Sequence, residues 1–384
     1  MTNHQDRYKG REQSYIKHYF LTQYLELAAF KTLQGSSQTF NFVDAFAGPW
    51  RVADATDYSD ASFDQALNTL ESVRVYLARR GQSGLKIRFC FCERDLQSAE
   101  RLRRYAEERH AFEIYVFPGA FEDNLQNVAA ACKGGFTFTF IDPTGWNIDS
   151  GPVLEFLSRR RGEVLLNFMA EDINRHVRYE GVSRSVGRFL AEPDWKDEFN
   201  ALPKDWSNEK RILHLLKKRM KMGNAARYVP DFPILKPREN RVKMRLLLGT
   251  RSAHGVDAFR EAQWKVERTQ IKMRNRIRRE ERSSPTLLPD EEVAMLEQDS
   301  AGIGCPVFQR EAREFVIDRL SEPKSLLFQD IANDAMEAVP IRMTQVKDLL
   351  LEMRSEGRVA FDLPGRKIKP LKGTRINLVE TPPV

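Results

Sequence analysis

An apolar stretch ends in a carboxylate at Asp44 and runs directly into a turn of small residues. The segment Phe42–Pro49 reads FVDAFAGP, so Phe46 and Gly48 follow Asp44 closely. Small residues after a first parallel strand let a ligand approach the backbone, as in dinucleotide-binding folds. We expect Asp44, Phe46 and Gly48 to contact a nucleoside or amino-acid ligand, with the Asp44 carboxylate meeting its ammonium group. The alternative is a glycine turn after an ordinary α/β strand.

Two further acidic sites follow the next two apolar runs. The run FCFCE ends at Glu93, about 50 residues after Asp44. Nucleotide-binding folds place there, usually about 20 residues after the glycine turn, a carboxylate that accepts hydrogen bonds from the ribose hydroxyls. Glu122 and Asp123 follow the third run beside Phe121, where an adenine ring could be held. Acids in the first turn of a helix, favoured by its macrodipole, explain Glu122 and Asp123 equally well.

The fourth apolar run ends in TFIDPTGW, which places Asp142, Pro143 and Trp146 together. An Asp-Pro turn at the carboxyl end of a strand brings polar backbone groups and an aromatic ring to the edge where α/β sheets bind ligands. Amino-methylating enzymes carry an Asp-Pro-Pro-aromatic turn there, which accepts hydrogen bonds from the target amine. This chain departs from that turn after Pro143, so the target atom stays open. We expect Asp142, Pro143 and Trp146 to form the catalytic side, with Asp142 orienting or deprotonating the acceptor.

Polar residues also follow the later apolar runs. Asn167, Asn174 and Arg175 come after the fifth run and could face a substrate, although helix capping and packing are the favoured alternatives. Arg251 and His254 could reach the same edge, but a helix capped at Ser252 explains most of that pattern.

The elements that must position these residues alternate between short β-prone runs and helical patterns, which is typical of a parallel α/β sheet. Strands are expected at 39–45, 86–92, 112–117, 136–142 and 163–169, and an antiparallel hairpin at 228–235 and 242–248. A first helix over 14–33 shows no chemistry, and a helical insertion spans about 172–224. This inventory is that of a Rossmann-like class I methyltransferase sheet. We expect this α/β domain to span 1–270, with a linker at 271–300.

The C-terminal part, 301–384, is expected to be a second, smaller winged-helix domain. Three short helices precede two β-prone runs, and the third helix, 343–356, has one apolar face. Its Lys347, together with Arg366, Lys367 and Lys369 of the following hairpin, predicts contacts with nucleic acid phosphates. Docking of another protein is the competing interpretation.

Several of these strings together resemble the three-Cys-motif partner (TcmP) proteins. They are FNFVDAFAGPW, FCFCERD, FEDNL, FTFTFIDPTGWNI and EVLLNFM, with LLLGTRSAHGVDAFREAQWKV further on. The resemblance implies a methyltransferase-like domain with a winged helix, and association with a radical-SAM-type protein that bears three cysteines, commonly beside phage or mobile-element genes. Asp44, Gly48, Glu93 and Asp142 match the strand-end motifs of that family. Many relatives have a glycine where this chain has Trp50, which implies a tighter cofactor loop here.

Composition and charge narrow the class of function. The 384 residues carry a net charge of +7, and basic residues concentrate in 204–221 and 265–282. Each run predicts either phosphate contact or an ordinary solvated helix face. The four cysteines show no metal-ligand spacing, and neither a membrane span nor a secretory signal is readable, so we expect a cytoplasmic protein.

The favoured hypothesis is an enzyme that transfers methyl from S-adenosylmethionine to nucleic acid, with DNA as the expected form. A non-catalytic DNA-binding or regulatory protein that keeps the Rossmann shell is one alternative. A different reaction on a base or nucleotide is another.

Overall fold

The computed structural model describes residues 7–35, 37–48, 58–143, 145–282, 288–363, 365 and 367–379. The chain divides into two compact units, Met1–Ser252 and Ala253–Val384. No helix among the described residues is long and apolar enough to cross a membrane.

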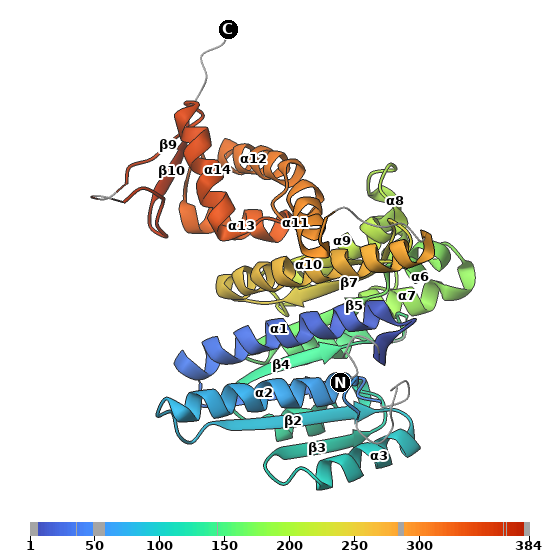
Figure 1. The fold of residues 1–384 in the computed structure, drawn as a ribbon. Coiled ribbons are helices and arrows are strands. Elements are labelled where there is room, and N and C mark those ends of the chain that lie inside the picture. Colours follow the sequence, from blue (N-terminus) through green and yellow to red (C-terminus); the bar gives the residue numbers. More distant parts are fainter. Residues whose placement is uncertain are drawn as a thin grey trace. The chain divides into compact units, whose positions relative to one another are not determined.

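The first unit is a mixed α/β structure built on one seven-stranded sheet (Figure 1). Its strands, in the order β3-β2-β1-β4-β5-β7-β6, are β1 (Thr39–Asp44), β2 (Lys86–Glu93), β3 (Glu113–Pro118), β4 (Phe136–Ile141), β5 (Gly162–Phe168), β6 (Asp231–Leu235) and β7 (Val242–Gly249). The first five strands are parallel, β7 runs antiparallel to β5, and the edge strand β6 pairs antiparallel with β7. The mostly parallel sheet and its closing hairpin, predicted from apolar runs, are therefore confirmed, and each predicted strand overlaps an observed one.

Helices cover both faces of this sheet. They are α1 (Glu12–Gly35), α2 (Ser62–Arg79), α3 (Leu96–Glu107), α4 (Leu125–Ala131), α5 (Ser150–Ser158), α6 (Ala170–His176), α7 (Ser183–Leu190), α8 (Trp195–Ala201) and α9 (Asn208–Met222). Phe42 of β1 and Phe138 of β4 lie on the face that packs against α1, where Tyr24 contacts Phe138 with ring centroids 5.8 Å apart. Val43 and Ile141 point to the opposite face and join the core with α5 and the helices of the insertion. Because side chains alternate along a strand, the face of each strand-end residue follows from this pattern.

The second unit begins with a long helix, α10 (Ala253–Arg282). It continues with α11 (Asp290–Ala301), α12 (Pro306–Ser321), β8 (Ser325–Leu327), α13 (Phe328–Ala338), α14 (Met343–Ser355), β9 (Val359–Ala360) and β10 (Arg375–Leu378). The three strands form a small antiparallel sheet in the order β8-β10-β9. The sequence did not predict β8, which has only three residues, and the second of the two expected β-prone runs is confined to β10. Pro370 and Gly373 precede β10, and such residues disfavour a regular strand.

The division between the units falls at Ser252/Ala253, earlier than the expected boundary within 271–300. The stretch expected as a linker is largely helical. Its charged residues belong to the end of α10 and to α11, and these two helices form ion pairs with each other. Arg268 and Lys272 of α10 form ion pairs with Glu291 of α11, and Arg279 pairs with Asp290. The basic run 265–282 is thus partly neutralised within the unit.

Candidate functional site

A pocket of about 550 Å³ opens at the carboxyl ends of β1 to β4. Five of the nine predicted cofactor and catalytic residues line it: Phe46, Glu93, Glu122, Asp123 and Asp142. The pocket also contains residues that the sequence did not single out, namely Arg94, Asn147, Asp149 and Arg188. Acidic side chains outnumber basic ones on its walls, so the pocket favours a ligand with positive charge.

Glu93 ends β2 and is almost completely buried in the pocket wall. Its Oε1 accepts a hydrogen bond from the backbone N–H of Asp95 at 2.7 Å, which fixes the carboxylate at the start of α3. Burial raises the pKa of Glu93, although that hydrogen bond opposes the effect. Next to it, Gly119 adopts φ +108°, which other residues rarely adopt, and so turns the chain sharply after β3.

Glu122 and Asp123 begin a short 3-10 helix and stand at the pocket mouth. Glu122 accepts a hydrogen bond at 2.9 Å from the backbone N–H of Asp149, the residue that caps α5. Glu122 therefore joins the β3 turn to the β4 turn, whereas Asp123 is exposed. The alternative that these acids only stabilise the first turn of a helix explains Glu122 in part. Both residues nevertheless line the pocket.

Asp142 follows β4 and forms an ion pair with Lys17 of α1, while its Oδ1 accepts a hydrogen bond at 2.7 Å from Asn167 of β5. Burial alone would raise the pKa of Asp142, but the Lys17 ammonium and the hydrogen bonds outweigh burial and hold the pKa below its ordinary value. The carboxylate is thus ionised and oriented from both sides.

Lys17 was missed because α1 was interpreted only as an apolar packing helix. Its neighbour His18 is also buried, and burial lowers the pKa of His18 to about 3, so His18 is neutral. Two consecutive polar residues on the apolar side of a helix were the available signal, since buried charged groups are almost always paired.

Asp44 does not line the pocket. Strand alternation places its side chain on the α2 face, where it is fully buried and accepts hydrogen bonds from Ser62 Oγ at 2.7 Å and from the backbone N–H of Phe46 at 3.1 Å. Asp44 fixes the turn that carries Phe46 into the pocket. Gly48 is not among the lining residues either, and Trp50 lies outside the described residues.

Pro143 and Trp146 also stay outside the pocket. Pro143 is buried, and the Trp146 indole N–H donates to Ser185 Oγ at 2.9 Å, so the ring packs on the insertion. Asn174 and Arg251 contact main-chain groups of neighbouring helices, consistent with packing rather than substrate contact.

Burial raises the pKa of Asp44 to about 7, well above its value in an unfolded chain, and this shift predicts a pH effect. A raised pKa in the folded state means that the folded protein binds the proton more tightly, so stability is lost as pH rises toward 7. The loss is at most about 4 kcal/mol for a shift of this size. In urea unfolding, the free energy of unfolding of wild type should fall between pH 5 and pH 8, and it should fall by more than that of Asp44→Asn. Parallel pH profiles of the two proteins would contradict this assignment.

Fold and site together define a mixed α/β protein whose mostly parallel sheet carries an acidic pocket at the carboxyl ends of its strands. The chain matches no protein-family model and no curated protein. Among solved structures it is similar to a Legionella pneumophila protein of the family model DUF519, with a TM-score of 0.34 and 11% sequence identity over 62% of this chain and 85% of that chain. A similarity this weak carries no argument about fold or function.

Proposed function

We propose that this chain is a methyltransferase that uses S-adenosylmethionine. The observation that carries the proposal is the pocket at the ends of four successive parallel strands, the place where α/β sheets bind nucleotide-like ligands. Its volume lies within the range of small-molecule sites. The lining residues fit the cofactor. Glu93 can accept hydrogen bonds from the ribose hydroxyls, Phe46 offers apolar surface to the adenine, and the acidic walls suit the sulfonium and ammonium charges.

S-adenosylmethionine would supply an already activated methyl group, so the protein mainly has to align the acceptor at about 3–3.5 Å. Asp142 is suited to that task. Its pKa below the ordinary range makes it a poor proton acceptor, but an ionised carboxylate is a strong hydrogen-bond acceptor. We therefore assign Asp142 to orienting an N–H or O–H group of the acceptor, and Lys17 and Asn167 to holding Asp142 in place.

The second unit supports a nucleic acid as the acceptor. Its helices α12, α13 and α14 and its three-stranded sheet fit the winged-helix arrangement expected from the sequence. The apolar face of α14 is buried through Val346, Leu349, Leu350 and Met353. We propose that this unit is a winged helix that presents α14 and the segment after β9 to DNA. The resemblance to TcmP proteins adds the proposal of a radical-SAM-type partner.

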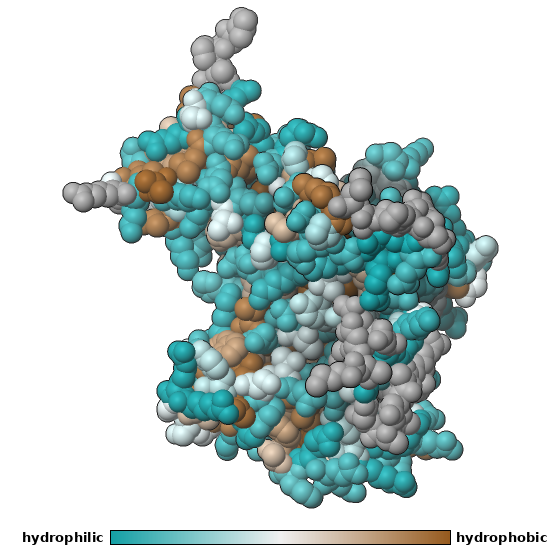
Figure 2. Space-filling view, in the orientation of Figure 1, coloured by the Kyte–Doolittle hydropathy of each residue, from teal (hydrophilic) through white to brown (hydrophobic). Residues whose placement is uncertain are grey.

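The side chains predicted to contact phosphates on this surface have different surroundings. Lys367 is exposed, Lys369 pairs with Asp348, and the Lys347 ammonium lies 5.8 Å from the centre of the Phe328 ring. Arg366 lies outside the described residues. Apolar residues, among them Ile368 and Leu371, are exposed near these lysines, and Figure 2 shows brown patches on the second unit.

Changing Lys367 and Lys369 to Ala should weaken binding of duplex DNA and flatten its salt dependence by about 0.9 in the log-log slope for each lost phosphate contact. Fluorescence anisotropy at several salt concentrations measures both effects. Lys324→Ala, a change of the same type outside this segment, is the control. Unchanged affinity of the double variant for DNA would contradict DNA binding by this surface and favour the interpretation that it docks another protein.

The proposed function is tested most directly by mass spectrometry of any small molecule retained by the purified protein, followed by calorimetry with S-adenosylmethionine. Retention or binding of the cofactor, or of its demethylated product, supports the proposal. If wild type binds neither, the chain is not an enzyme of this class, and the non-catalytic alternative takes its place.

A further inference from the structure

The β6–β7 hairpin extends past the edge of the sheet where the pocket opens. β5 ends at Phe168, which lies opposite Arg245 of β7, whereas β7 already begins at Val242. Residues 236–244, here called the hairpin extension, therefore continue beyond the carboxyl end of β5. Asp142 follows β4, the neighbour of β5, at that same carboxyl edge.

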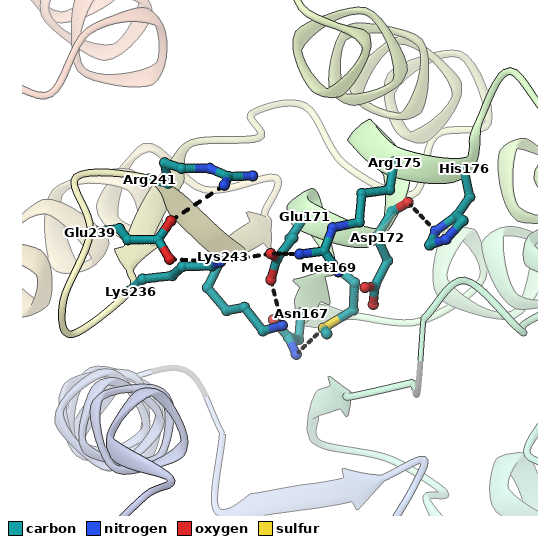
Figure 3. Close-up of polar contacts among 10 residues, drawn as sticks. All are labelled: Asn167, Met169, Glu171, Asp172, Arg175, His176, Lys236, Glu239, Arg241 and Lys243. Carbon is teal, nitrogen blue, oxygen red and sulfur yellow. Dashed lines mark hydrogen bonds and ion pairs between the residues drawn. The ribbon is translucent and has the colours of Figure 1, made fainter.

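Two cations of the extension meet a third from α6 around one buried carboxylate (Figure 3). Lys236 Nζ and Lys243 Nζ each lie 2.7 Å from the carboxylate of Glu171, and Arg175 lies 2.5 Å from it. The Glu171 side chain is only 4% exposed. Although burial raises its pKa, the bonds from Lys236 and Lys243 outweigh burial and lower the pKa to about 2, so Glu171 stays ionised.

These four residues, here called the Glu171 cluster, carry a net charge of +2. The neighbouring acid Glu239 is itself paired. Glu239 pairs with Arg241 at 3.3 Å as well as with Lys236 at 3.5 Å, so the Glu239–Arg241 pair adds no net charge. Figure 3 draws no contact between the Asp172 carboxylate and the four residues of the cluster. A single cation would neutralise Glu171, so the cluster holds more positive charge than its own carboxylate requires.

The cations of the cluster can reach a further anion. The side chains of Arg175 and Lys243 are 56% and 30% exposed, respectively. An ammonium has three N–H donors and a guanidinium has five, and Glu171 occupies only part of them. Phosphate oxygens are the acceptors for which such donors are best suited, with Arg binding in a bidentate manner and Lys acting as a compact charge.

Asn167 connects the cluster to the pocket. Its Nδ2 donates to Asp142 at 2.7 Å, and Figure 3 shows the same residue beside Lys243. Its Oδ1 is buried and has no hydrogen-bond partner among the described residues. A ligand that lies along Asp142, Asn167 and Lys243 would thus contact the oriented carboxylate of Asp142 at one end and the positively charged Glu171 cluster at the other.

We propose that the Glu171 cluster binds a phosphate of the acceptor and so brings its reactive base to Asp142. This inference rests on the proposed function, and it adds that the acceptor is an oligonucleotide strand recognised through its backbone at this edge. It differs from the winged-helix surface, which belongs to the second unit.

The test uses the full chain without S-adenosylmethionine, and a fluorescent single-stranded oligonucleotide as the probe. Lys243→Gln removes one cation and leaves Glu171 paired with Lys236 and Arg175, so we expect a several-fold loss of affinity and a salt slope reduced by about 0.7. Glu171→Gln raises the net charge of the cluster to +3 and should tighten binding. Lys218→Gln is the matched control, because Lys218 also pairs with a glutamate, Glu198, in the same unit.

Photo-crosslinking of the same oligonucleotide, located by mass spectrometry, should label peptides that contain residues 236–244. A mononucleotide competitor separates the two sources of phosphate, and we expect it to compete only weakly. Equal affinities for Lys243→Gln and Lys218→Gln, crosslinks confined to the second unit, or full competition by the mononucleotide would overturn the proposal. Cofactor binding is measured separately. Lys243-dependent binding without any cofactor affinity would refute the methyltransferase and leave the phosphate surface standing.

Discussion

Replacing Lys17 with Met is expected to lower the free energy of unfolding by about 3 kcal/mol at pH 7, because it leaves the Asp142 carboxylate without its counter-charge in a mostly buried position. The side chains of Lys17 and Asp142 are 10% and 21% exposed, which places the loss at the lower end of the range for buried pairs. Adding Asp142→Asn to this variant should restore much of the stability, because the amide carries no charge.

The pH dependence distinguishes this effect from simple loss of packing. In wild type, the lowered pKa of Asp142 means that the stability from the pair is present at neutral pH and is lost on acidification below its unfolded pKa. Without Lys17, burial raises the pKa of Asp142, so the deficit of the variant should grow as pH rises from 4 to 7.

Urea unfolding measures both predictions, with Lys196→Met as the control. Lys196 pairs with Glu180 at 3.6 Å on the surface, so its loss should cost less than about 1 kcal/mol. Similar small losses for Lys17→Met and Lys196→Met would show that the Lys17–Asp142 pair contributes little.

Glu93→Ala should weaken binding of S-adenosylmethionine by about 100-fold or more. Two hydroxyl donors to one carboxylate contribute about 1.5–3 kcal/mol each, and every 1.4 kcal/mol is a factor of ten. Glu93→Gln keeps the shape and one acceptor oxygen, so it should fall between wild type and Glu93→Ala. Isothermal titration calorimetry gives the three dissociation constants.

Glu113→Ala provides the matched control for Glu93. Glu113 is a glutamate at the opposite, amino end of the neighbouring strand β3, where it pairs with Arg88 on the surface. The affinity of the Glu113→Ala variant for S-adenosylmethionine should stay within about twofold of wild type, because a surface ion pair contributes little. Equal cofactor binding by Glu93→Ala and Glu113→Ala would remove Glu93 from the site.

The sequence predicted the sheet well because its signal is local. Each of the five parallel strands is a short apolar run bounded by turn residues. Burial on both faces makes the runs of β1, β2, β4 and β5 nearly continuous, whereas β3 lies at the sheet edge and is only partly buried. The same logic located Glu93 and Asp142, since the carboxyl ends of parallel strands meet at one edge.

The contacts that decide a residue's role were not predictable in this way. Asp44 ends β1 and Asp142 directly follows β4, yet Asp44 contacts Ser62 of α2, whereas Asp142 contacts Lys17 of α1 and also lines the pocket. Such differences depend on how helices distant in sequence pack, and spacing alone does not specify that. Likewise, the basic run 204–221 predicted phosphate contact or a solvated face. Lys217, Lys218 and Arg219 within it form ion pairs with acids of the same unit.

The pair between Lys17 and Asp142 also has a consequence for the order in which the chain folds during synthesis. Its partners are 125 residues apart, so the ammonium of α1 leaves the ribosome long before the carboxylate that it will neutralise exists. Contacts of such sequence separation form late and slow the folding of a domain. Until β4 and β6 emerge, Tyr24 and Phe20 of α1 lack their partners Phe138 and Phe232, so the nascent chain exposes part of the apolar side of α1. The ion pair beside the pocket is thus completed only after more than half of the first unit has been synthesised.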